Sequence, residues 1–182
     1  NQPQQRTQEY SLCADYSHSW EKWHLQTGAK GNLYITSDGK AFAAIDPSVC
    51  LSYVTSDFGK LSFVYGWQHQ YLFQTGFSSM GLPTEFWFSC GKNSPPQYAR
   101  SLSLTYDTEL FDGDYSLSVG LYHKKLFHQV EYNGNMFDFL RTSYNLDELL
   151  LKGRGENYGI NVMLDKRTGR LTGWVSYALG RA

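Results

Sequence analysis

Apolar and polar residues alternate with a period of two along most of the chain. The pattern is clear in 9–20, 23–34, 61–71 and 154–166, where Leu, Val and Tyr alternate with Ser, Asn and Gln. Such alternation places apolar side chains on one face of a strand and polar side chains on the other. These segments exceed the usual strand length and are long enough to cross a bilayer at a tilt. The sequence therefore predicts an all-β, antiparallel up-and-down meander of about eight long strands, part of an outer-membrane β-barrel.

Short and long connections alternate between the expected strands. Tight turns are predicted near 20–22, 55–60, 110–114 and 166–169, where Gly59, Gly113 and Gly169 can supply positive φ angles. Long loops are predicted near 35–46, 72–98 and 130–153. Because consecutive strands run in opposite directions, all the tight turns then lie at one end of the sheet. Outer-membrane barrels sort their connections this way, with short periplasmic turns and long extracellular loops.

Aromatic residues gather near the predicted tight turns: Trp20, Trp23, Phe58, Phe111 and Tyr115. Aromatic girdles at the membrane interface have this distribution. The alternative is a soluble protein in which the apolar face points inward, either a sandwich or a small autonomous eight-stranded barrel that binds an apolar ligand, as lipocalins do. In both cases residues 1–182 form one structural unit, which agrees with the length of the chain.

Composition narrows the possible partners. The net charge is −1 and basic residues are not clustered, which argues against nucleic acid as a partner. Mean hydropathy is −0.46, and no apolar run is long enough for a membrane helix. The first residues lack the apolar region of a signal peptide, so we expect either a cytosolic protein or a piece downstream of its own export signal. Cys13, Cys50 and Cys90 are expected to be free thiols.

No group of residues has the spacing of a catalytic or metal site. His123 and His128 would lie on opposite faces of a regular strand, and the acidic pairs fall in predicted turns. We therefore expect no enzyme, cofactor or metal. One set of loop aromatics could bind a ligand by stacking, or could simply pack together: Phe86, Trp87, Phe88, Tyr98, Tyr132 and Phe137.

The second half of the chain resembles a known family. The resemblance rests on Leu82-Pro-Thr-Glu-Phe-Trp87, on Gly153-Arg-Gly-Glu-Asn-Tyr-Gly159 and on the hairpin sequence Lys166-Arg-Thr-Gly-Arg-Leu-Thr-Gly-Trp-Val-Ser-Tyr177. These runs, with the ending Leu179-Gly-Arg181, are similar to the barrel of TonB-dependent outer-membrane receptors. The similarity is best from about Leu82 onward, and before that only the strand pattern continues.

This resemblance implies transport. The family's barrels have about 22 strands around an N-terminal plug domain, so the chain is expected to be an internal segment of the barrel wall and its extracellular loops. The implied partners are outer-membrane lipid, the rest of the barrel, the plug domain and an unknown nutrient. The implied location is the outer membrane of a Gram-negative bacterium. An isolated segment would have unpaired edges, so we expect it to close on itself, to pair with a copy or to need the remaining strands.

Overall fold

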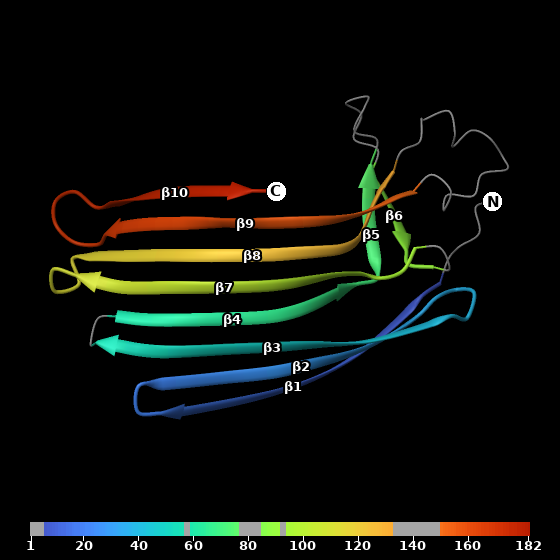
Figure 1. Ribbon diagram of the computed structural model, residues 1–182, viewed down its shortest axis with the longest axis horizontal. Helices are drawn as coiled ribbons and strands as arrows, with labels where there is room; N and C mark the ends of the chain where they lie inside the picture. The colour runs from blue at the N-terminus through green and yellow to red at the C-terminus, as the bar shows by residue number, and fades with distance from the viewer. Residues whose placement is uncertain (1–5, 57–58, 77–84, 92–93, 133–149) are drawn as a thin grey trace.

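The computed structural model describes residues 6–56, 59–76, 85–91, 94–132 and 150–182. Within these ranges it contains strands and no helix. Eight antiparallel strands form the main sheet in the order β1-β2-β3-β4-β7-β8-β9-β10 (Figure 1). Their bounds are β1 Gln8–Trp20, β2 Trp23–Ile35, β3 Ala41–Ser56, β4 Gly59–Gln70, β7 Gln97–Leu110, β8 Tyr115–Tyr132, β9 Leu150–Lys166 and β10 Gly173–Arg181. The predicted all-β meander of eight long strands is confirmed.

Two short strands form a separate hairpin, β5 (Leu72–Gly76) paired with β6 (Glu85–Ser89). This hairpin lies inside the segment 72–98, for which a long loop was predicted. Figure 1 shows it standing across one end of the main sheet, between β4 and β7 in the chain. Pairing satisfies the backbone hydrogen bonds of this segment, which a loop of this length would otherwise leave to water or side chains.

The tight connections lie together at the other end of the sheet, on the left of Figure 1. Trp20 pairs with Trp23 across a turn in which Glu21 has a φ of 48°. Between β7 and β8, Gly113 has a φ of 90°, and between β9 and β10 Gly169 has a φ of 100°. Glycine adopts these angles without the steric cost that other residues carry. The turn between β3 and β4 includes 57–58, which lie outside the described residues.

At the loop end, the connection between β2 and β3 is shorter than the expected loop over 35–46. Pairing continues to Ile35 and Ala41, and the Thr36 amide donates to the Lys40 carbonyl at 2.9 Å. The left-handed φ of 79° at Gly39 allows the chain to reverse within this short turn. The connection between β8 and β9 contains 133–149, which lie outside the described residues.

The main sheet is open. Along the described chain β1 pairs only with β2, and β10 pairs only with β9. The two end strands lie at opposite sides of the sheet in Figure 1. The described strands thus do not close into a small lipocalin-like barrel, and both edges carry backbone groups available for further pairing.

Candidate functional site

The main sheet has one apolar and one polar face, because the strand register keeps like residues side by side. An apolar row crosses seven strands: Leu25, Leu51, Phe63, Leu104, Leu121, Ile160 and Leu179. A polar row crosses the same region on the other face: Ser52, Ser62, Thr105, Gly120, Asn161 and Ala178. Four side chains of the apolar row are exposed, including Leu104 at 40% and Leu121 at 49%, and the other three are half-buried. No described protein layer covers this face.

Aromatic residues border the apolar face at both ends. At the turn end, Trp23 lies 6.5 Å from Trp20 and 4.6 Å from Tyr53 between ring centroids. Phe111 contacts Tyr115 edge-on at 5.6 Å. Four of the five aromatic residues expected near the turns thus make ring contacts, two at the β1–β2 turn and two at the β7–β8 turn; Phe58 lies outside the described residues. At the loop end the aromatic row includes Trp67, Tyr98 and Phe127.

Strands β3 and β4 separate at the loop end of the sheet. The last pair that joins them is Ser48 with Gly66, and Pro47 is the neighbour of Ser48 on the loop side of β3. Proline has no N–H to donate and interrupts the pairing of a central strand. Beyond this point, 41–47 of β3 pairs only with β2 and 67–70 of β4 pairs only with β7. We call this stretch the β3–β4 opening.

A hydrogen-bond network of side chains spans the β3–β4 opening. Asp46 Oδ2 accepts from the His69 backbone N–H at 3.2 Å and from Asn32 Nδ2 at 2.8 Å. Asp46 Oδ1 also contacts His69 Nδ1. Asn32 Oδ1 accepts from the Ser11 hydroxyl at 2.9 Å, so the network joins all four strands from β1 to β4. Asp46 and Asn32 are buried, and the carboxylate replaces the missing backbone partner of His69.

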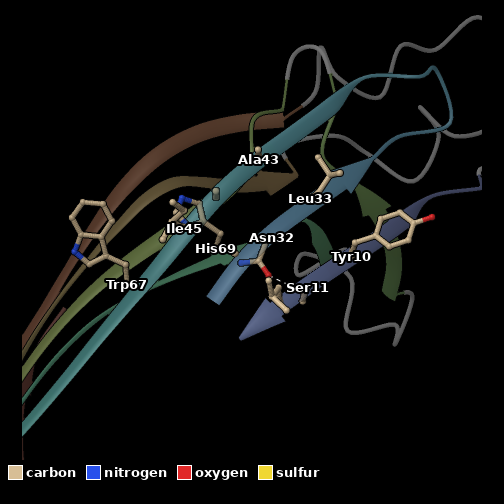
Figure 2. Close-up of a pocket in the computed structure, with 11 residues that line it drawn as sticks. Tyr10, Ser11, Asn32, Leu33, Ala43, Ile45, Trp67 and His69 are labelled. Atoms are coloured by element: carbon tan, nitrogen blue, oxygen red, sulfur yellow. Dashed lines mark hydrogen bonds between the residues drawn. The ribbon is translucent and has the colours of Figure 1, made fainter. Parts of the chain in front are cut away.

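Two hollows with different linings adjoin the opening. The first, of about 820 Å³, is largely apolar and includes Tyr10, Leu12, Leu33, Ile45, Trp67 and His69 in its wall. Figure 2 shows Trp67 and Tyr10 at opposite ends of this hollow, with Asn32 and Ser11 between them. The second, of about 530 Å³, also touches Trp67 and His69 but is lined by polar groups including Lys30, Gln68, Gln97 and Lys124. Its amide and ammonium groups can bind oxygen-rich or anionic molecules.

The network continues as stacked rings on the apolar face. His69 stacks on Tyr98 at 5.4 Å, and Tyr98 stacks on Phe127 at 4.5 Å. The Arg100 guanidinium lies 4.3 Å from the centre of the Trp67 ring. Trp67 is itself held by donating its indole N–H to the Tyr65 hydroxyl at 2.6 Å. Rings and cation together fix the side chains at the loop end of β4, β7 and β8.

A small core joins the β5–β6 hairpin to the polar face of the sheet. Tyr34 stacks on Tyr71 at 5.0 Å, and Phe73 and Cys90 are buried beside them. Phe42 and Ala44, at polar-face positions of β3, pack against this cluster. Burial, with a smaller contribution from the Asp46 carboxylate, raises the pKa of Tyr71 from 10.0 to about 12.

Burial also raises the pKa of the Cys90 thiol from 9.0 to about 11. The two tyrosine hydroxyls have no hydrogen-bond partner among the described residues. The hairpin thus packs on the sheet through apolar contacts, and it covers part of the polar face at the loop end.

The predicted ligand-binding aromatics are distributed over several elements. Trp87 lies exposed on β6, whose backbone also includes Phe86 and Phe88. Tyr98 belongs to β7 and stacks with His69 and Phe127. Tyr132 ends β8, and Phe137 lies outside the described residues. The shared ligand surface stays a prediction.

Sequence reasoning missed Asn32, Asp46 and His69. The available signal was Pro47, at the border of the expected loop over 35–46. A proline there interrupts strand pairing and leaves backbone groups that a neighbouring polar side chain can satisfy.

The histidine pair of β8 differs from its expected geometry. A bulge shifts the register between Leu126 and Gln129, and His128 has a φ of 55°. His123 Nε2 lies 2.7 Å from Glu156 Oε1, whereas His128 Nδ1 lies 3.1 Å from the Pro96 carbonyl. Across the described ranges, no three His, Cys, Asp or Glu residues form a group that could hold a metal ion.

The solved structures that this chain matches include TonB-dependent outer-membrane receptors. The FrpB iron transporter from Neisseria meningitidis matches 96% of this chain with a TM-score of 0.70 and 13% identity. The fold is that of a TonB-dependent receptor wall. The alcaligin outer-membrane receptor FauA from Bordetella pertussis matches 97% of the chain with a TM-score of 0.60 and 12% identity. The ferric-catecholate import receptor Fiu from E. coli matches 97% with a TM-score of 0.57 and 12% identity.

The chain spans 26% of FrpB, 31% of FauA and 28% of Fiu. No family model and no curated protein matches the sequence. The structural match confirms the fold that the resemblance implied, and it does so although few residues are identical.

Proposed function

We propose that this chain forms part of the wall of an outer-membrane transporter of the TonB-dependent receptor type, which takes up a nutrient. The observation that carries the proposal is the exposed apolar face bordered by aromatic residues at both ends. In water such a face would be costly, whereas in a bilayer lipid tails cover it and the aromatic rows lie at the two interfaces. The polar face then lines the lumen.

The open edges fit this role. Within a bilayer every backbone N–H and C=O group needs a partner in the protein, which only a closed barrel provides for strands. We expect β1 and β10 to pair with further strands of the same barrel and the plug domain to fill its lumen. The tight turns then face the periplasm, and the β5–β6 hairpin faces the outside of the cell.

The β5–β6 hairpin gives the extracellular end a specific role. It packs on the polar face through Tyr34 and Tyr71, so it narrows the lumen on the substrate's path. Trp87 is 61% exposed on this hairpin and offers a ring on which a substrate can stack. We propose that Trp87, with its neighbours on β6, contacts the nutrient before it passes the hairpin.

Environment-sensitive labels on neighbouring residues test the assignment of the two faces. Leu104→Cys and Ser103→Cys place the same label one residue apart on β7 but on opposite faces, in the full chain inserted in lipid vesicles with the native cysteines replaced. We expect lipid-attached nitroxides to quench the label at 104, and a water-soluble quencher to reach the label at 103. The reverse pattern would show an inward apolar face and would reject the transporter wall.

A further inference from the structure

Two cations lie side by side on the apolar face. Arg100 of β7 and Lys125 of β8 are direct cross-strand partners, near the loop end of both strands. Like charges placed directly opposite each other in a sheet are destabilising. Both side chains are exposed, and together with His123 and Glu156 they interrupt the apolar face near its loop end. This placement needs an explanation, because charged groups on such a face are unfavourable unless they lie near an interface or find a counter-charge.

Only one of the two cations is neutralised within the described chain. Lys125 Nζ lies 3.6 Å from Glu156 Oε1, and the same carboxylate is 2.7 Å from His123 Nε2. Arg100 has no carboxylate within ion-pair distance among the described residues. Its guanidinium is instead held over the Trp67 ring and lies 5.5 Å from the centre of Phe127. A cation stacked on aromatic rings keeps its N–H donors free at the edge of the guanidinium plane.

We propose that Arg100 and Lys125 bind the phosphate of a lipid headgroup at the outer end of the apolar face. A phosphate offers several acceptor oxygens, which match the planar donors of Arg100 and the ammonium of Lys125. It relieves the repulsion between the two cations. The Trp67 and Phe127 rings lie at the depth where headgroup and acyl chains meet. This inference rests on the proposed function, because it needs the apolar face to contact lipid.

Lipid retention measures the proposed site directly. The full chain is equilibrated in vesicles that contain equal amounts of phosphatidylglycerol and phosphatidylcholine, extracted gently into detergent, and analysed for the lipids that remain bound. The unmodified chain is expected to retain phosphatidylglycerol preferentially. Arg100→Gln is expected to reduce this preference about tenfold, because it removes a charge-assisted contact to phosphate. Lys125→Gln is expected to have a smaller effect, since Glu156 already offsets that charge.

Lys60→Gln provides the matched control. It removes one positive charge on the polar face of β4, next to the tight turns, and should leave the lipid preference unchanged. An unchanged preference in Arg100→Gln would overturn the proposal. The proposal would also be overturned if millimolar inorganic phosphate displaced the bound phosphatidylglycerol, since that would identify a site for the free anion.

The two proposals fail differently. If the label at position 104 lies in lipid and Arg100→Gln keeps the preference, only the headgroup site is rejected. If the label at position 104 lies in water, the transporter wall is rejected, and the headgroup site with it.

Discussion

The two ends of the main sheet are held together in different ways. At the end with the tight turns, backbone pairing joins each strand to its neighbours, whereas at the loop end β3 and β4 separate beyond the pair Ser48 and Gly66. Side chains replace the backbone there: the Asp46 network spans the opening, and a small apolar core anchors the β5–β6 hairpin. One end is therefore specified by strand pattern and turn chemistry. The other depends on a few individual residues, and it is the end where a substrate and the lipid headgroups would be met.

The largest expected effect concerns the apolar face that runs between these two ends. Leu104→Arg places a charge at the middle of β7 and should lower the free energy of unfolding in vesicles by about 2–4 kcal/mol. Ser103→Arg, on the polar face, should change it by less than about 0.5 kcal/mol. Denaturant titration of the vesicle-inserted chain measures both. Equal effects at the two positions would mean that the faces do not differ in environment.

Asp46→Ala tests whether side chains hold the loop end together. It leaves the buried Asn32 amide and the His69 N–H without their acceptor, so we expect a loss of about 1–3 kcal/mol. Hydrogen exchange of the His69 amide should become faster. Asp107→Ala is the control: Asp107 accepts from Ser118 at 2.6 Å, but it lies where backbone pairing is continuous. Unchanged exchange at His69 would contradict the role of the network.

Gly159→Ala tests the continuous part of the sheet. A Cβ at this position would lie 2.4 Å from the Leu179 carbonyl oxygen and 2.8 Å from the Tyr122 hydroxyl. The backbone contact cannot yield easily, so β10 should shift and stability should fall by about 1–2 kcal/mol. Gly153→Ala on the same strand meets nothing within 4 Å and serves as the control. The unfolding temperatures of the two variants are compared with that of the unmodified chain. Equal stability of the two variants would show that the close approach of β9 and β10 at Gly159 does not require glycine.

The smallest effect concerns pH and the β2–β3 turn at the loop end. The Thr36 hydroxyl donates to the Asp38 carboxylate and lowers the pKa of Asp38 below 3.8. Because the carboxyl has a lower pKa in the folded than in the unfolded state, it stabilises the turn at pH values above its unfolded-state pKa. This stabilisation is lost as the pH falls through the folded-state pKa. NMR titration should therefore find Asp38 titrating below 3.8, and Thr36→Val should move it upward. If Asp38 had the same pKa in the unmodified chain and in Thr36→Val, the Thr36 hydroxyl would not be the cause of the lowered pKa.

Much of the molecule follows from local sequence. The period of two in β1, β2 and β9 predicts strands, their faces and their order, because hairpins with tight turns leave few alternatives. Within 41–46 the same reasoning failed: the segment was expected to be loop, yet it continues β3, because pairing with β2 outweighs the weak pattern of its alanines. The β5–β6 hairpin was also missed, since each of its strands is too short to show a period.

The sequence by itself determined the all-β class, the two faces and the end that bears the tight turns, because each depends on residues close together in the chain. Only the tertiary structure decided that Asp46 meets His69, that Tyr34 meets Tyr71, and that Arg100 lies between Trp67 and Lys125. These contacts join strands far apart in sequence. The contact between Asp46 and His69 also depends on the β3–β4 opening, where a proline interrupts the pairing and no local pattern specifies the partner.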